Sequence, residues 1–384
     1  MAKQTKIAIV GAGPAGSSLA IRLAKLGFDV TLIDKDTFPR HKLCGEFISP
    51  ECLDHFEDLG IKSDLLALGG DRITQTRFFS AAGRSVTVPT EWFGRERFAL
   101  SLSRAEMDHT LWQAAIRAGV RGIMGFRVMS AESLDGSVVA VDLRATDGSR
   151  SRVKADVFID ASGRSAVLSN LIDSDRRTIQ GRANLVGFKA HVSGVTFEPG
   201  ICEIYFFEGG YAGLSHVENG EANFCGLVTS KFARQFIGNT NLLFQHVVLA
   251  NARANTRMSH AVPLHDWLAV KVDRFGIRKP PPAKNVLSIG DAGAFMDPFT
   301  GSGILMALES ARIAASMFSS KELQPSSYYT EHREFFGRRL KVASILRSAA
   351  FSHRMAAAAI RIAGLSNGFR EVLARATRMG SAAR

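Results

Sequence analysis

Short apolar runs separated by glycine-rich turns open the chain. The run Ile7–Val10 leads into one such turn, and leucines then recur at helical spacing between residues 19 and 26. Gly27 would end that helix, and Val30–Ile33 has the composition of a buried strand. Residues 6–34 therefore predict a strand, a helix and a second strand, an arrangement that needs a parallel sheet.

Period-two alternation predicts strands further along the chain, over residues 73–79, 84–89, 126–160 and 183–230. Residues 104–118 instead carry the spacing of an amphipathic helix, and from Gly303 the pattern is helical to the end. These elements predict an α/β fold with a discontinuous first domain, a Rossmann-like parallel sheet with ββα layers. We expect that domain from residues 1–72, 98–170 and 280–320, a β-sheet-rich substrate domain from 73–97 and 171–279, and a basic helical segment from 321–384.

The composition is that of a globular protein with room for two cores. Of the 384 residues, 46% are hydrophobic and 22% are charged. The cysteines form no CxxC pair, which argues against a zinc site or a disulfide framework. We find neither a secretory signal nor a run of about 18 apolar residues, so we expect a cytoplasmic protein.

The net charge of +12 is concentrated at the C-terminus. Residues 321–384 carry 12 Lys and Arg against 4 Glu, while the rest of the chain carries 36 basic against 32 acidic residues. This local surplus is not typical of nucleic-acid binding, and we expect no nucleic-acid partner. Arg347, Arg354 and Arg361 recur every seven residues, which would place three cations on one helix stripe. The segment either rests peripherally on anionic lipid or is a solvated helical cap.

The turn after the first apolar run has the spacing of a dinucleotide-binding loop. Gly11 would form the tight turn, Gly13 would let a diphosphate approach the backbone, and Gly16 would let helix and strand pack. Pro14 and Ala15 open the helix, whose free N–H groups and positive dipole end attract phosphate.

Asp34 lies 23 residues past Gly11, at the end of the second predicted strand. Its carboxylate would accept hydrogen bonds from ribose hydroxyls and would repel a 2′-phosphate, so we do not expect NADP as the resident ligand. A strand before the loop, a helix after it and an acid at this spacing predict a dinucleotide site.

A second glycine-rich segment, Gly290–Ile304, follows another apolar run. Asp291 would hydrogen-bond the ribityl or pyrophosphate part of a long cofactor, and Asp297–Pro298 would form a rigid turn beside its ring. Gly301, Ser302 and Gly303 would open a helix whose N–H groups point at the N1/O2 edge of a flavin, where reduced flavin carries negative charge. Together the two segments predict FAD, held at both ends.

Gly290–Ser310 resembles the segment found in geranylgeranyl reductase-like FAD oxidoreductases. That branch belongs to the larger class of aromatic hydroxylases and flavin-dependent halogenases. Pro39–Pro50 resembles the next motif of the branch, Asp160–Arg164 the middle motif of the class, and Arg104 an arginine that the class uses against FAD. The resemblance covers residues 1–60, 98–168 and 284–316.

This resemblance implies a Rossmann-like FAD-binding domain in which the loop after the ribose acid runs along the cofactor. Arg40 and Lys42 would lie near the phosphates, and Cys44 and Gly45 near the flavin ring. The full set expected to hold FAD is Gly11, Gly13, Pro14, Ala15, Gly16, Asp34, Lys35, Arg40, Lys42, Cys44, Gly45, Arg104, Gly163, Gly290, Asp291, Pro298, Gly301, Ser302, Gly303 and Ile304.

Two features depart from the wider class. Ser162–Gly163 stands where aromatic hydroxylases usually carry an Asp-Gly pair, which weakens transfer of their NAD(P)H handling. The three tryptophans stand apart, so the Trp-x-Trp signature of the halogenases is absent and we do not favour halogenation.

Cys44 and Tyr211 are the candidate catalytic residues. Cys44 either contacts substrate or relays a proton beside the flavin, or it packs as a small apolar residue. Nearby Glu46 and His41 are alternatives as acid–base groups, but each is expected to be a solvated loop charge. Tyr211 lies between glycines in an aromatic stretch that the resemblance places over the flavin, whereas Ile204 and Phe206 are expected in the core.

We therefore expect an FAD-dependent oxidoreductase that reduces a carbon–carbon double bond in an apolar molecule such as an isoprenoid, quinone or polyketide. NAD(P)H or a reduced electron carrier would bind transiently as donor. A monooxygenase acting on a similar substrate, and an electron-relay flavoprotein docked at the inner face of a membrane, remain alternatives.

Overall fold

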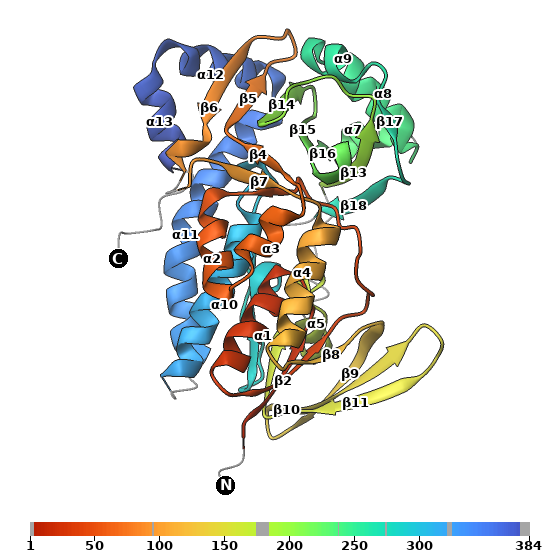
Figure 1. Cartoon of the computed structure of the whole chain (residues 1–384), viewed down its shortest axis with the longest axis vertical. Helices are drawn as coiled ribbons and strands as arrows, with labels where there is room; N and C mark the ends of the chain where they lie inside the picture. Colours follow the sequence, from red (N-terminus) through yellow and green to blue (C-terminus); the bar gives the residue numbers. More distant parts are fainter. Residues whose placement is uncertain are drawn as a thin grey trace.

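The computed structural model describes residues 4–93, 96–173, 184–236, 238–272, 275–320 and 325–376. Its elements form two β-sheet units, one above the other in Figure 1, with C-terminal helices along one side. The mixed α/β fold predicted from the sequence is confirmed, and the boundaries between the predicted domains stay a prediction.

A five-stranded parallel sheet forms the centre of the lower unit. Its order is β20 (Val286–Ser288), β12 (Val157–Asp160), β1 (Lys6–Val10), β2 (Asp29–Ile33) and β8 (Arg121–Ile123). Its middle strands are almost entirely apolar and buried, as a parallel sheet covered on both faces requires. The strands from the two glycine-rich segments therefore lie in one sheet.

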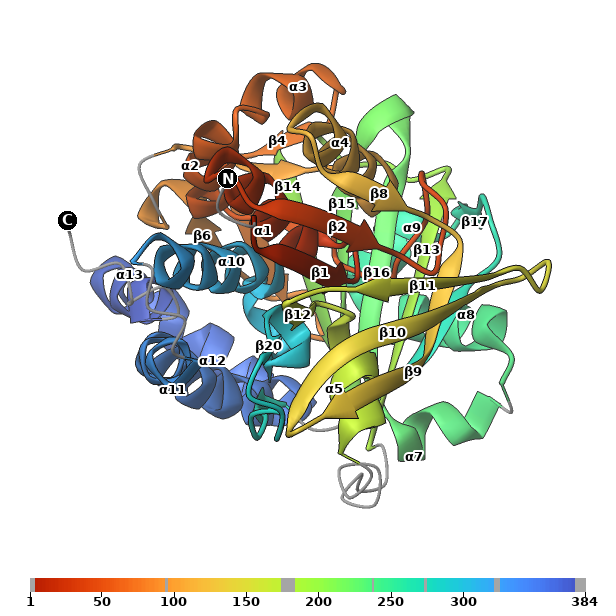
Figure 2. The same ribbon diagram turned by 90° about the horizontal axis from the view of Figure 1, so that it is seen from below.

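Helices cover one face of this sheet and a small antiparallel sheet covers the other (Figure 2). The helices are α1 (Pro14–Lys25), α2 (Pro50–Leu59), α3 (Lys62–Ala67), α4 (Arg104–Arg117) and α10 (Gly303–Ser319). The opposite layer consists of β9 (Phe126–Leu134), β10 (Ser137–Ala145), β11 (Arg150–Lys154) and α5 (Val167–Ile172). The antiparallel sheet, the parallel sheet and the helices thus form the three layers of the predicted ββα arrangement.

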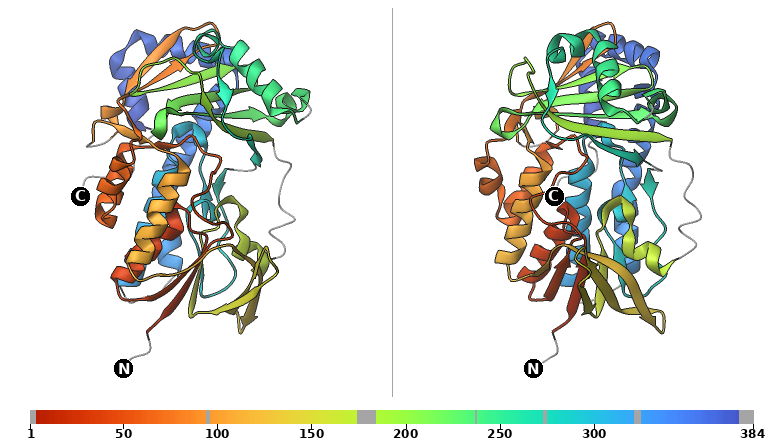
Figure 3. Two further views of the ribbon diagram at one scale, coloured as in Figure 1. Left: turned by 45° about the vertical axis from the view of Figure 1, so that its right-hand side comes forward. Right: turned by 90° about the vertical axis from the view of Figure 1, so that its right-hand side faces the viewer.

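The upper unit is an eight-stranded sheet (Figure 3). Its strands are β17 (Val262–Pro263), β13 (Leu185–Ser193), β16 (Ala222–Thr229), β15 (Gly210–His216), β14 (Ile201–Phe207), β5 (Gln75–Phe79) and β6 (Ser85–Pro89), with β18 (Leu268–Val272) also paired to β13. Its outer face packs on α7 (Ser230–Ala233), α8 (Thr240–Leu249) and α9 (Ala252–Met258).

Short elements join the two units. One small sheet consists of β3 (Phe47–Ile48), β7 (Ala99–Ser101) and β4 (Asp71–Ile73), and another of β19 (Gly276–Ile277) and β21 (Ala294–Phe295). Single 3₁₀ turns are η1 (Thr90–Trp92), η2 (Gly163–Ser165), η3 (Glu218–Gly220), η4 (Arg234–Phe236), η5 (Gly290–Ala292) and η6 (Pro298–Thr300).

Both faces of β14 contribute to hydrophobic clusters. Tyr205 and Phe207 are fully buried against the outer helices, in the core of the eight-stranded sheet. Ile204 and Phe206 point to the inner face and line a cavity. The expectation that these two residues belong to the core is confirmed for Phe206, which is buried in a second hydrophobic cluster, whereas Ile204 is only partly buried against that cluster.

Three helices follow α10: α11 (Pro325–Ala350), α12 (His353–Leu365) and α13 (Asn367–Ala376). The chain turns between α11 and α12, so the seven-residue spacing of arginines does not produce one stripe. Arg347 is instead half-buried, with Nε 3.5 Å from Oδ2 of Asp297 and its guanidinium over the ring of Phe275. Among the described residues, no helix has the length and apolar character needed to cross a bilayer.

Candidate functional site

A cavity of about 860 Å³ lies between the two units. The carboxyl ends of β1, β2 and β12 open onto it, which is where open parallel sheets bind ligands. Its other wall is the inner face of the eight-stranded sheet, and its far end reaches α12 and α13. The cavity is therefore polar and glycine-rich at one end and apolar at the other.

The first glycine loop forms the start of this cavity. Gly11, Gly13, Pro14 and Ala15 line it, and Gly13 begins α1 without any side-chain cap, so N–H groups of the first turn face the cavity. Gly11 has φ +105°, and a Cβ there would lie 2.3 Å from the carbonyl oxygen of Ala161. Gly16 lies behind the wall, where a Cβ would lie 1.8 Å from the oxygen of Gly11. The loop thus packs as the sequence pattern requires.

Asp34 directly follows β2 and is almost fully buried beside this loop. Its Oδ2 accepts a hydrogen bond from the Ala12 N–H at 2.7 Å, and its Oδ1 accepts one from the Asp36 N–H at 2.9 Å. The side chain is held rigidly on the cavity wall, next to Lys35. This placement suits a carboxylate that accepts hydrogen bonds from ribose hydroxyls.

A basic cluster faces the glycine loop. Arg104 binds Asp108 through two hydrogen bonds of 2.9 and 2.8 Å, and Arg40 donates to the same carboxylate at 2.8 Å. The guanidinium of Arg104 lies beside Gly13, 3.8 Å from where a Cβ would stand. Burial and the charge of Arg40 lower the pKa of Lys42, which also lines the cavity. One buried aspartate thus orients two arginines, a third cation lies nearby, and an anionic diphosphate would complement this cluster.

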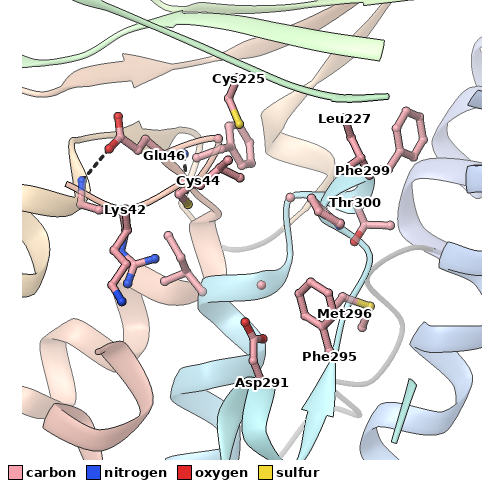
Figure 4. A pocket seen from close by; sticks show the side chains of 18 of the residues that line it. Lys42, Cys44, Glu46, Cys225, Leu227, Asp291, Phe295, Met296, Phe299 and Thr300 are labelled. Carbon is pink, nitrogen blue, oxygen red and sulfur yellow. Dashed lines mark hydrogen bonds between the residues drawn. The ribbon is translucent and has the colours of Figure 1, made fainter. Parts of the chain in front are cut away.

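The second glycine segment lies on the same cavity. Pro298, Gly301, Gly303 and Ile304 line it, and α10 begins there without a side-chain cap. Cys44 and Gly45, from the loop before β3, lie on the wall with them (Figure 4). Gly163 also lines the cavity, whereas Gly290 and Ser302 lie behind the wall.

Asp291 directs its carboxylate into the cavity (Figure 4). Burial raises the pKa of this group to about 6, although Arg164, Arg104 and Arg278 oppose the rise. A half-buried carboxylate turned toward open space is suited to accept hydrogen bonds from ligand hydroxyls. Two uncapped helix starts, a basic cluster and two carboxylates match a ligand with a diphosphate, a ribose and a ribityl chain. The residues present therefore fit FAD.

Glu46 is the centre of a buried charged cluster that the sequence did not reveal. It is fully buried, with φ +54°, and accepts hydrogen bonds from Lys189 Nζ, from the Arg104 N–H at 2.8 Å and from His191 Nε2 at 2.7 Å. Burial alone would raise its pKa, but the charge of Lys189 and the hydrogen bond from His191 outweigh this and lower it. The expectation of a solvated loop charge is wrong. This cluster fixes the loop that carries Cys44.

The far end of the cavity is aromatic. Tyr211 packs edge-on against Phe299 with ring centroids 5.1 Å apart, and Phe78 and Phe206 complete the group. The hydroxyl of Tyr211 is buried and has no hydrogen-bond partner among the described residues. The ring of Tyr211 lines the cavity, and a buried hydroxyl left unpaired costs free energy unless a ligand group reaches it.

Comparison with known proteins agrees with this geometry. The profile of the FAD binding domain family matches residues 4–321. A menaquinone reductase of Mycobacterium tuberculosis is 27% identical over 83% of this chain and 77% of its own length. A tryptophan 2-halogenase of Chondromyces crocatus is 26% identical over 82% of this chain and 61% of its own. The structure of a geranylgeranyl bacteriochlorophyll reductase-like protein from Thermoplasma acidophilum superimposes with a TM-score of 0.78 at 18% identity, covering 99% of this chain and 97% of that one.

Replacing Asp34 by alanine should weaken FAD binding roughly tenfold to a hundredfold, because hydrogen bonds to a charged acceptor contribute about 1.5–3 kcal/mol. Flavin content after purification and titration of the apoprotein with FAD measure the change. Asp29→Ala is the matched control, since Asp29 is exposed at the start of the same strand. Unchanged affinity in Asp34→Ala would remove this residue from the site.

Proposed function

This chain belongs to the FAD binding domain family, and we propose that it reduces a carbon–carbon double bond in an apolar, isoprenoid- or quinone-like molecule. That the protein is an FAD-dependent oxidoreductase follows from the family and its relatives. What we propose beyond that is the reaction and the substrate class. The observation that carries them is the continuous cavity, which joins the expected flavin position to an aromatic chamber.

The chamber is suited to a long apolar ligand. Its walls come from β5, β6, β14 and β15, from η6 and from the inner faces of α12 and α13. Phe78, Phe206 and Phe299 offer their rings, and small residues of α12 leave room beside them. Apolar walls with one precisely placed polar group are the usual composition of a small-molecule site. The name of the mycobacterial relative supports a quinone-like member of this class.

FAD would supply hydride to the substrate after accepting electrons from NAD(P)H or a reduced carrier, and a proton from a nearby group or water would complete the reduction. The chain's own residues would bind and orient the substrate and exclude water from it. The uncapped start of α10 places N–H donors near the expected ring. Tyr211 would donate a hydrogen bond to a substrate oxygen and orient the molecule.

Halogenation is less well supported than reduction. Trp92, Trp112 and Trp267 do not line the cavity, and Trp112 instead stacks on Phe38 behind it. The similarity to a halogenase therefore supports the family and not that activity. Because molecules with isoprenoid chains reside in membranes, the proposal includes a position on the cytoplasmic face of a membrane.

The proposal is tested by the second half-reaction alone. The FAD-loaded protein is reduced with dithionite without oxygen and mixed separately with menaquinone in detergent and with oxygen-saturated buffer. We expect menaquinone to restore the oxidised flavin absorbance in the absence of oxygen. Reoxidation by oxygen alone, through a transient absorbing intermediate, would favour the monooxygenase and overturn the proposal.

Tyr211→Phe should slow this anaerobic reoxidation about threefold to tenfold, the effect of losing one neutral hydrogen bond of 0.5–1.5 kcal/mol. Flavin content should not change, because Tyr211 packs against Phe299 in the aromatic group and not at the first glycine loop. Tyr205→Phe is the control: its hydroxyl donates to Glu203 at 2.7 Å in the core, so it should alter thermal stability and leave reoxidation unchanged. Equal rates in Tyr211→Phe and the unmodified protein would exclude the assigned contact.

A further inference from the structure

We infer that α12 and α13 form a docking face for anionic lipid, placed beside the apolar end of the cavity. The inference deepens the proposed function, on which it rests for the direction of substrate entry. Three features of the described residues support the docking face: an exposed apolar stripe, adjacent arginines and the point where the cavity reaches the protein surface.

The inner side of α12 is already explained by packing. Ala356, Ile360 and Ala363 recur at helical spacing, are buried and line the cavity. The helix packs on β6 and β14, at the edge of the eight-stranded sheet (Figure 1). This face accounts for one apolar side of the helix.

The outer side of α12 is apolar as well. Met355, Ala358, Ile362 and Leu365 recur at i, i+3, i+7 and i+10, which places them on one stripe. Leu365 is 85% exposed, and Ile362 and Met355 are 55% and 53% exposed. Val372 on α13 is 64% exposed. A surface helix normally turns polar residues outward, so a second apolar stripe indicates contact with something other than water.

Arginines adjoin this stripe. Arg354 and Arg361 are one position before Met355 and Ile362, and both are exposed. Residues 353–376 contain four arginines and a single glutamate, Glu371, which is paired with Arg375. Exposed apolar side chains beside cations are the composition of a helix that lies in an anionic membrane surface.

The charges also argue against a second copy of this chain as the partner of the docking face. A second copy of the chain on this face would bring equal arginine clusters together, which costs free energy. Anionic lipid headgroups instead offer negative charge for the arginines and apolar tails for the stripe within one partner.

The cavity reaches the surface at the same helix. Ala359 lines the cavity and is itself exposed, between the inner and outer stripes of α12. A molecule leaving a bilayer at this helix would enter the aromatic chamber directly. The docking face therefore gives an apolar substrate a path that avoids water.

Vesicle co-sedimentation of the full chain tests the inference. We expect the protein to bind vesicles of phosphatidylcholine with an equal part of phosphatidylglycerol, and to bind pure phosphatidylcholine weakly. Arg354→Gln/Arg361→Gln should weaken partitioning about fivefold per arginine. Ile362→Ser/Leu365→Ser should weaken it at least about tenfold, with flavin content and melting temperature unchanged.

Leu134→Ser is the matched control, since Leu134 is 62% exposed on the β9–β10 hairpin at the far end of the molecule. An unmodified protein that ignores anionic vesicles, or a control that weakens binding as much as the double serine variant, overturns the inference. The inference is also overturned if the unmodified protein is a dimer in gel filtration and does not bind vesicles, and the double serine variant is a monomer. Vesicle binding without reoxidation by menaquinone would contradict the proposed function alone, and reoxidation without vesicle binding would contradict the surface alone.

Discussion

Replacing Lys189 by methionine is expected to lower the free energy of unfolding by about 3–5 kcal/mol, because it leaves the buried Glu46 carboxylate without its cation. Lys189 is 2% exposed and Glu46 is fully buried, so water cannot replace the lost charge. The hydrogen bonds from His191 and Arg104 remain but do not neutralise the carboxylate. Urea or thermal unfolding of the FAD-loaded protein measures the effect.

Two further variants separate the loss of charge from the loss of packing. Lys154→Met changes an exposed lysine on β11 and should alter stability by less than about 0.5 kcal/mol. Adding Glu46→Gln to Lys189→Met removes the unpaired charge and should recover part of the loss. If Lys189→Met lowers the free energy of unfolding no more than Lys154→Met does, the stabilising role of the Glu46 cluster is contradicted.

Gly13→Ala is expected to weaken FAD binding roughly a hundredfold, the upper end of the 1–3 kcal/mol that overpacking costs. Gly13 has extended backbone angles that alanine adopts freely, and apart from its chain neighbours only the Arg104 guanidinium, among the described residues, lies within 4 Å of the new Cβ. The apoprotein should therefore stay folded. The methyl group would instead occupy the space through which a diphosphate approaches the backbone.

The control for this change is Gly337→Ala, in α11, where no atom of the described residues beyond the helix's own backbone and chain neighbours lies within 4 Å of the added Cβ. It should keep its flavin and unfold no earlier than the unmodified protein. Gly16→Ala should behave differently from both, because its Cβ would collide with the Gly11 carbonyl and destabilise the fold itself. A Gly13→Ala protein that keeps full FAD affinity would place the diphosphate elsewhere.

The two glycine segments could be predicted from sequence because their chemistry is local. The turn at Gly11–Gly16 and the start of α10 at Gly303 each depend on residues a few positions apart. Strand periodicity gave the correct alternation along β14 as well. It did not give the side that faces the cavity, since that depends on α8 and α9, which pack from later in the chain.

The Glu46 cluster could not be predicted for a related reason. Glu46 and its partner Lys189 are 143 residues apart, and no local pattern links them. The charged cluster forms only when β13 folds over the loop that carries Cys44. Likewise, the arginine spacing indicated a basic stripe, but the break between α11 and α12 directs Arg347 toward Asp297. The exposed apolar stripe of α12 became visible only when its buried face was known.

The mass of the product distinguishes reduction of the isoprenoid chain from electron relay and from oxygenation. The reduced protein is mixed with menaquinone without oxygen, the products are then exposed to air so that any quinol ring reoxidises, and the quinone is analysed by mass spectrometry. Our account predicts a quinone that keeps two additional hydrogen atoms, located in its isoprenoid chain. A quinone that returns to its starting mass would mean electron relay to the ring alone, and one that gains an oxygen atom would mean monooxygenation. Either result would contradict the account.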